Sequence, residues 1–370
     1  MKPSHDLSAS QLLQVVRTGF ERIPDHRAAN AKIELPDALM SSFAMFSLKD
    51  SSLLAFDQRR ATDDNLKRIY GLTAIPCDTQ MRTIVDPVSP DHLKPLFKDV
   101  IEQLRQRRIL AQLKFRDHYL VSLDGSGYFT STEIHCASCL EKKSRKTGEV
   151  TYAHQALVGA IVHPDFKEVV PLAPEAIVKQ DGTTKNDCER NAAKRFFSRL
   201  RQDYPEWPFI ITEDALSANA PHLQELKKHN LRYIVGVKAG DHAFLFDYVA
   251  AAHQAGQTSE YECKVKGVIH RFRFINQVPL NASHPDLLVN FIEYWEIDGN
   301  KVQHFCWITD FTITTVNVFE LMRGGRARWK IENETFNTLK NQGYKLIALR
   351  AILNTTTGMV SNSSRSTWPR

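Results

Sequence analysis

The sequence predicts an α/β protein in which a mixed sheet is flanked by helices, with a helical module before the sheet and a β-rich insertion within it. Two observations carry this prediction. Apolar residues recur at helical spacing as far as about residue 112, and from residue 116 they follow the shorter period of extended strands. After an antiparallel start, strands and helices alternate, which is typical of a sheet with both parallel and antiparallel neighbours.

Composition indicates a globular protein with a modest excess of positive charge. The chain has 370 residues, 42% of them hydrophobic, which is enough for a buried core and for two or three domains. The net charge is only +6, but basic residues gather in runs. These runs are Arg105, Arg107 and Arg108; Lys142, Lys143, Arg145 and Lys146; and Arg323, Arg326, Arg328 and Lys330. One such run is usually a solvated face, whereas several runs beside acidic residues favour a phosphate backbone as partner.

Cysteine usage and hydropathy indicate the compartment. Six scattered cysteines are too few for a disulfide framework, so a reducing environment fits best. We find neither a signal peptide nor an apolar run of about 18 residues, the length that a membrane-spanning helix needs. We therefore expect a cytoplasmic protein without a membrane partner.

Residues 1–112 form the predicted helical N-terminal module. Its segments 7–20, 34–58 and 90–113 have apolar residues at helical spacing, and the first opens with a serine cap. Such a module either binds DNA or braces the rest of the chain, and both interpretations stay open.

The sheet and its helices are expected over residues 113–239. The predicted elements are strands at 119–131, 150–164 and 167–178, a helix at 185–204, a strand at 208–214, a helix at 220–230 and a strand at 231–239. Short extended segments then indicate a β-rich insertion over 240–311. A helix that returns to the sheet is expected within 312–344. The polar, Ser/Thr-rich stretch 345–370 predicts a disordered tail.

Three acidic residues are the candidate catalytic site. Asp124 and Asp214 each come where a strand pattern ends, and Glu332 lies on the helix expected after the insertion. Ligands gather at the carboxyl ends of strands in such sheets, so these acids are expected to meet. Carboxylates from separate segments can bind two Mg²⁺ or Mn²⁺ ions, which clamp the attacking and leaving oxygens of a phosphoryl transfer. The alternative is ordinary turn and surface chemistry, since Asp-Gly after a strand is also a turn signal.

The segments around these acids resemble a known enzyme family. LDGSGYF around Asp124, ITEDALSANAP around Asp214 and RARWKIENETFNTLK around Glu332 are similar to the three acidic motifs of bacterial insertion-sequence transposases of the DDE class. The resemblance covers residues 116–344 and implies a ribonuclease H-like catalytic core with a β-rich insertion between the second and third acids. It also implies that Asp124, Asp214 and Glu332 hold catalytic Mg²⁺.

The same resemblance implies a function and partners. The expected reaction is metal-dependent cleavage and strand transfer of DNA, with the element's terminal inverted repeats and target DNA as partners. A homodimer on DNA and a bacterial cytoplasmic location, at the nucleoid when bound, are expected by analogy. Two rivals fit the same residues: a nuclease of related fold, and a DNA-binding remnant without catalysis.

Basic and aromatic residues complete the implied DNA site. Arg328 matches the arginine of the family's tyrosine, arginine, glutamate, lysine signature, and Lys340 lies one residue from its lysine. Both are expected to hold DNA phosphates. Gly325 occupies the position of the signature's tyrosine, so that element of the signature is absent. Trp329 either stacks on a displaced base or belongs to the core. Lys142, Lys143 and Arg145 are further candidate DNA contacts.

A second metal site is weaker in the sequence. Cys136 and Cys139 form a CxxC motif with His135 beside them and His154 nearby, which are ligand types for zinc. A strong signal needs two such pairs, and only one is present. The alternative is a pair of reduced cysteines in a loop.

Overall fold

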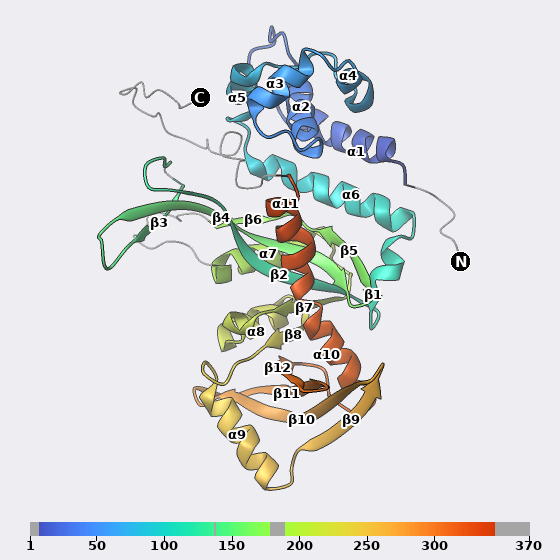
Figure 1. Cartoon of the computed structure of the whole chain (residues 1–370), viewed down its shortest axis with the longest axis vertical. Coiled ribbons are helices and arrows are strands. Elements are labelled where there is room, and N and C mark those ends of the chain that lie inside the picture. Colours follow the sequence, from blue (N-terminus) through green and yellow to red (C-terminus); the bar gives the residue numbers. More distant parts are fainter. Residues whose placement is uncertain (1–6, 137, 178–188, 345–370) are drawn as a thin grey trace.

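A computed structural model describes residues 7–136, 138–177 and 189–344 of the chain (Figure 1). The tail predicted over 345–370 lies outside these residues. Among the helices described, none is long and apolar enough to cross a bilayer.

The described residues contain a twelve-stranded mixed sheet. The strands are β1 (Lys114–Phe115), β2 (His118–Ser131), β3 (Leu140–Lys143), β4 (Val150–His163), β5 (Phe166–Pro171), β6 (Glu175–Ile177), β7 (Phe209–Glu213), β8 (Arg232–Gly236), β9 (Ser259–Val265), β10 (Val268–Asn281), β11 (His284–Asp298) and β12 (Lys301–Thr309). Their order is β3-β4-β2-β7-β8-β12-β11-β10-β9, with β1, β5 and β6 pairing beside β2 or β4. The β2–β7 and β7–β8 pairs are parallel and the others are antiparallel. The prediction of a mixed sheet flanked by helices is therefore confirmed.

Helices cover both faces of this sheet. Side chains alternate along each strand, so consecutive residues pack against helices on opposite faces. Val121 of β2 belongs to one buried cluster, together with residues of α7 (Glu189–Asp203), α8 (Ala220–Lys228) and α9 (Ala243–Gln254). Leu120, the preceding residue, belongs to the opposite cluster, with residues of α10 (Val318–Arg326). Figure 1 shows α10 and the helices after it crossing in front of the sheet.

The N-terminal helices build a core of their own. They are α1 (Ala9–Glu21), α2 (Leu35–Ser47), α3 (Leu53–Arg60), α4 (Asn65–Tyr70), α5 (Asp78–Val85), η1 (Pro90–Leu93), α6 (Lys94–Gln106) and η2 (Leu110–Leu113). Ser8 caps α1 with a capping box, as its place before the apolar pattern predicts. Ile101 of α6 and Leu110 of η2 pack into the cluster under the sheet and so join the module to it.

The segment between β8 and α10 holds α9 and strands β9 to β12. Figure 1 places these strands at the end of the molecule opposite the N-terminal helices. They belong to the same sheet, because β12 pairs with β8 through Trp307–Gly236, Ile308–Val235 and Thr309–Ile234. Pairing between such distant segments depends on contacts that a local pattern does not contain.

After α10 the chain continues through a π-helix, η4 (Ile331–Phe336), and α11 (Asn337–Asn341). Two glycines let α10 pack closely on the sheet. A Cβ atom at Gly324 would lie 2.9 Å from Ile234 and Phe115 side-chain atoms, and one at Gly325 would lie 2.5 Å from Trp307 Nε1. The glycine found where the transposase signature has tyrosine therefore has a packing reason here.

Candidate active site

Asp124 lies within a strand rather than at its end. Strand β2 continues past Asp124 and Gly125 to Ser131, which confirms the strand predicted over 119–131. The expectation that the strand pattern ends at Asp124 and the alternative of an Asp-Gly turn are both wrong. What ends near this point is the pairing with β7, whose last Cα partners are Ser122 and Thr212. Beyond that pair β2 stays with β4, Asp124 opposite Val158. Asp124 therefore emerges where two parallel strands part, a usual place for a ligand site in an α/β sheet.

Asp214 comes directly after the last residue of β7, as its motif predicts. It lies two residues beyond Thr212, and Asp124 lies two residues beyond Ser122, so the register sets the two aspartates at equivalent positions on neighbouring strands. Its Oδ1 accepts a 3.0 Å hydrogen bond from the Leu216 backbone N–H and begins the short helix η3 (Ala215–Ser217). Both aspartates line one pocket of about 700 Å³.

Glu332 enters the site from the π-helix, with Arg328 between it and the sheet. The Arg328 guanidinium donates to Glu332 Oε1 at 2.7 Å and lies 3.7 Å from Asp124 Oδ2. The Ser122 hydroxyl donates to the Arg328 carbonyl at 3.0 Å. This bond holds the residues just before η4 against β2. π-Helical segments are rare in proteins, and those that occur are often found at functional sites.

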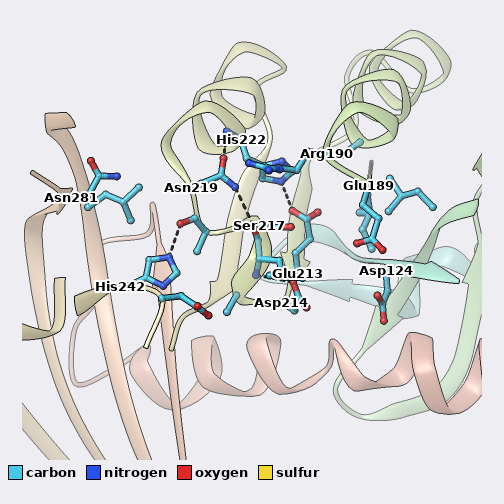
Figure 2. Close-up of a pocket in the computed structure, with 18 of the residues that line it drawn as sticks. Asp124, Glu189, Arg190, Glu213, Asp214, Ser217, Asn219, His222, His242 and Asn281 are labelled. Carbon is cyan, nitrogen blue, oxygen red and sulfur yellow. Dashed lines mark hydrogen bonds and ion pairs between the residues drawn. The ribbon is translucent and has the colours of Figure 1, made fainter. Parts of the chain in front are cut away.

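A fourth carboxylate, Glu189, joins the site from the first turn of α7. Figure 2 shows Glu189 beside Asp124 in the pocket, with Glu213 and Asp214 on the neighbouring strand. The Glu189 side chain fills the space next to Gly125, where a Cβ atom would lie 2.1 Å from its Oε1. Glu189 was not predicted from the sequence. The available signal was Gly125 itself, because a glycine inside a strand often marks a close approach.

Electrostatics tie these acids together. Burial raises the pKa of Asp124 to about 7; Arg328 opposes that rise, while the charges of Glu332 and Glu189 add to it. Burial also raises the pKa of Glu189, and the charges of Asp214 and Glu213 raise it further. Arg328 thus compensates only part of the negative charge that surrounds Asp124.

A buried ion pair supports the wall of the pocket. His222 of α8 lies with its Nε2 2.6 Å from Glu213 Oε2, and both side chains are buried. Burial lowers the pKa of His222, but the charge of Glu213 and its hydrogen bond outweigh that effect and raise it. The pair holds α8 against the end of β7, next to Asp214.

The acids offer the donor type that Mg²⁺ prefers, namely carboxylate oxygens from separate segments. They do not form a closed ligand set as they stand. Among the described residues, the groups of three or more metal-binding side chains whose ligand atoms lie within 4.8 Å of one another are Cys136, Cys139 and His154, and Glu293, His304 and Cys306. Arg328 contacts both Asp124 and Glu332, and its guanidinium supplies positive charge between these two acids.

Of the predicted DNA contacts, Arg328 and Lys340 are half-buried and the other four are exposed. Trp329 is 47% exposed, so the alternative that it belongs to the core is wrong, and its ring lies 4.7 Å from the Arg328 guanidinium carbon. The Lys340 ammonium lies over the Phe336 ring at 5.6 Å. The other three candidates, Lys142 and Lys143 on β3 and Arg145 in the turn after it, are exposed.

Of the two histidines named for the cysteine motif, the structure gathers one. His154 Nε2 lies 3.4 Å from Cys136 Sγ and 3.3 Å from Cys139 Sγ. His135 is not in this group, because its ring stacks on Tyr152 at a centroid distance of 4.3 Å. The expectation of His135 as a ligand is therefore wrong, whereas His154, the other histidine named, is brought next to the motif by β4.

Comparison with known proteins adds no relative to this description. No protein-family model matches the chain, and no curated protein matches it. The functional conclusion therefore rests on the geometry of the site and on the resemblance of its three motifs.

Proposed function

We propose that this protein is a DNA transposase of the DDE class, with a ribonuclease H-like core that cleaves DNA and joins the cut end to a target. The observation that carries the proposal is that Asp124 and Asp214 lie at equivalent positions at one end of the β2–β7 pair, while Arg328 contacts both Asp124 and Glu332. Glu189 adds a further carboxylate, and the neighbouring acids raise the pKa values of both Asp124 and Glu189.

In this proposal Asp124, Asp214 and Glu332 hold Mg²⁺ or Mn²⁺. When bound, the ions supply a nucleophilic water at neutral pH and neutralise charge on the phosphate. Side chains of the protein position the other groups. Arg328, already the donor to Glu332, orients that carboxylate and lies within reach of a phosphate oxygen. The exposed Trp329 ring offers a surface on which a base can stack.

The proposed reaction has two phosphoryl transfers. Water adds to phosphorus at the element's end as the bond to the 3′-oxygen breaks, which leaves a 3′-hydroxyl and a 5′-phosphate. That hydroxyl then attacks a target phosphodiester, and a 3′-oxygen of the target leaves with the proton. One phosphodiester replaces another in the joining step, so no external energy source is needed.

The test compares nicking of a supercoiled plasmid that carries the ends of the element, in Mn²⁺ and in EDTA. We expect the wild type to nick the plasmid in Mn²⁺ but not in EDTA, and Asp214→Ala to nick it in neither. The control variant Glu206→Ala removes an exposed acid away from the site and should nick normally.

The products then separate the rivals. Joined plasmid products support a transposase, and nicking without joining shows a nuclease. Binding to the ends without nicking by the wild type shows a DNA-binding remnant. Equal nicking by wild type and Asp214→Ala refutes the acidic site.

A further inference from the structure

A second group of side chains, away from the acids, has the composition of a soft-metal site. Two thiols and one imidazole meet at the root of the β3–β4 hairpin. Cys136 Sγ and Cys139 Sγ lie 3.7 Å apart, and His154 Nε2 lies 3.4 and 3.3 Å from them. Cys139 and His154 are buried, and Cys136 is half-buried.

These separations suit one tetrahedral ion. Zinc binds sulfur at about 2.3 Å and nitrogen at about 2.0–2.1 Å, so two sulfur ligands lie about 3.8 Å apart and a sulfur and a nitrogen about 3.6 Å apart. The observed distances are within a few tenths of an ångström of both values. Three ligands at the corners of one tetrahedral face thus already stand close to their bound positions.

Neighbouring groups hold the three ligands in place. The Cys136 backbone N–H donates to Cys139 Sγ at 3.3 Å and helps to hold that sulfur in position. The Tyr128 ring stacks on the His154 ring at a centroid distance of 5.8 Å, and Phe129 packs on it at 5.5 Å. These ring contacts restrict the rotation of the His154 side chain and keep its Nε2 beside the two sulfurs.

The pairing of β3 with β4 explains why the group forms. Leu140 is the Cα partner of Ala153, so Cys139 and His154, the next residues along each strand, are brought together by strand register. The CxxC turn supplies the second sulfur, with the Cys139 N–H donating to the Cys136 carbonyl at 3.2 Å.

The other candidate group is less suited to a metal. Its Glu293 carboxylate lies 2.5 Å from the Arg273 guanidinium, so its charge is already paired. His304, which approaches Glu293 at 2.9 Å, has a 46% exposed side chain. Within the described residues, none of the three side chains of the thiol-rich group makes a comparable ion pair with an arginine or lysine.

We propose that Cys136, Cys139 and His154 bind one Zn²⁺ ion, with the fourth position taken by water or by a ligand from outside this group. Binding releases the thiol protons to solvent and ties the loop after β2 to β4. Figure 1 shows β3 and the adjoining part of β4 reaching out from the sheet. The zinc would brace this hairpin, which presents Lys142, Lys143 and Arg145, and its role is separate from the acidic site.

The experiment measures zinc in the full chain after removal of loosely bound metal. We expect about one zinc per chain, and after exchange a cobalt spectrum with sulfur-to-metal charge transfer and tetrahedral d–d bands. Cys136→Ser and His154→Asn should lower the bound zinc at least about tenfold. Circular dichroism and the melting temperature in EDTA check that each variant folds.

Matched controls separate this site from other ligands. His135→Ala removes the adjacent histidine, Cys77→Ser removes a distant thiol, and Asp124→Asn alters the acidic site; all three should keep the zinc. Zinc retained by Cys136→Ser and His154→Asn would overturn the proposal, as would a zinc-free wild type that takes up no ion at micromolar zinc. A Cys136–Cys139 disulfide in the freshly purified protein, seen as a mass loss of two hydrogens, would also overturn it.

Discussion

Glu189 fits into the site because residue 125 has no side chain. A Cβ atom at Gly125 would lie 2.1 Å from Glu189 Oε1, although the two residues belong to a strand and a helix that are far apart in sequence. A glycine inside the Asp124 motif thus places a carboxylate that was not predicted from the sequence.

The variant Gly125→Ala should displace the Glu189 carboxylate and slow DNA cleavage. Displacement of an active-site group by about 1 Å costs about 100-fold in rate. Because the clash is with the flexible end of a side chain, we expect the free energy of unfolding to change by less than about 2 kcal/mol. Gly127→Ala is the matched control, since its Cβ atom would meet its nearest neighbours at 4.0 Å. Equal activity of the two variants would contradict a role for Glu189.

The ionisation of Asp124 should make the metal-free protein less stable as pH rises. Its pKa is raised from 3.8 to about 7, so the folded protein holds this proton over a range where the unfolded chain has lost it. Stability from this group is fully present below pH 3.8 and is lost as pH rises to about 7.

The measurement is denaturant unfolding of wild type and Asp124→Asn in EDTA at several pH values. The variant cannot ionise, so its advantage over the wild type should grow between about pH 4 and pH 7 and then level off. We expect about 2 kcal/mol, roughly half of what the two pKa values imply, because solvent screens this partly exposed carboxyl. A difference between the two proteins that does not vary with pH would show that Asp124 is not perturbed in the folded state.

Arg328 should stabilise the protein mainly when both neighbouring acids are charged. It donates to Glu332 at 2.7 Å and lies 3.7 Å from Asp124, so Arg328→Gln leaves two carboxylates without their shared cation. In EDTA we expect the free energy of unfolding of this variant to be lower than that of the wild type by about 1–3 kcal/mol at about pH 8. The difference should be smaller at about pH 5, where Asp124 is protonated. Chemical unfolding at the two pH values checks this. Arg328→Lys, which keeps the charge, should recover part of the loss at the higher pH.

Two tryptophans of different burial should behave in opposite ways. Trp329 is 47% exposed, so Trp329→Ala should change stability by less than about 0.5 kcal/mol and weaken binding of single-stranded or unpaired DNA by about 1–3 kcal/mol. Trp307 is only 5% exposed, and Trp307→Ala should cost about 3–5 kcal/mol of stability. Thermal melts and fluorescence anisotropy measure the two effects. A Trp329→Ala variant with unchanged DNA affinity would rule out base stacking at this ring.

The parts of the molecule that depend on local period could be predicted from the sequence. Strands β2, β4, β7 and β8 and helices α7 and α8 lie where alternating and helical patterns place them. The position of Asp124 was wrong in detail, because Asp-Gly suits a turn locally and only the pairing of β2 with β4 carries the strand onward. Local signals cannot distinguish these two outcomes.

Residues that meet through long-range pairing were predicted less well. His135 is next to Cys136 in sequence, but the register of Leu140 with Ala153 brings His154 to the thiols instead. Glu332 was expected on a regular helix, whereas the chain forms a π-helix there, docked through the Ser122 hydroxyl on the Arg328 carbonyl. Such contacts depend on the assembled sheet and have no signature in a single segment.

The pairing of Gly236 with Trp307 has a consequence for how this protein can change over evolution. The chain leaves the β2–β7–β8 sheet and returns to it at adjoining residues, so the excursion between them has its two ends side by side. A segment joined in this way can be lengthened, shortened or exchanged while the helix that brings Glu332 to Asp124 stays packed on the sheet. Because His242 and Asn281 of the excursion line the pocket of Asp124 and Asp214, each such change would also reshape the surroundings of the acidic centre.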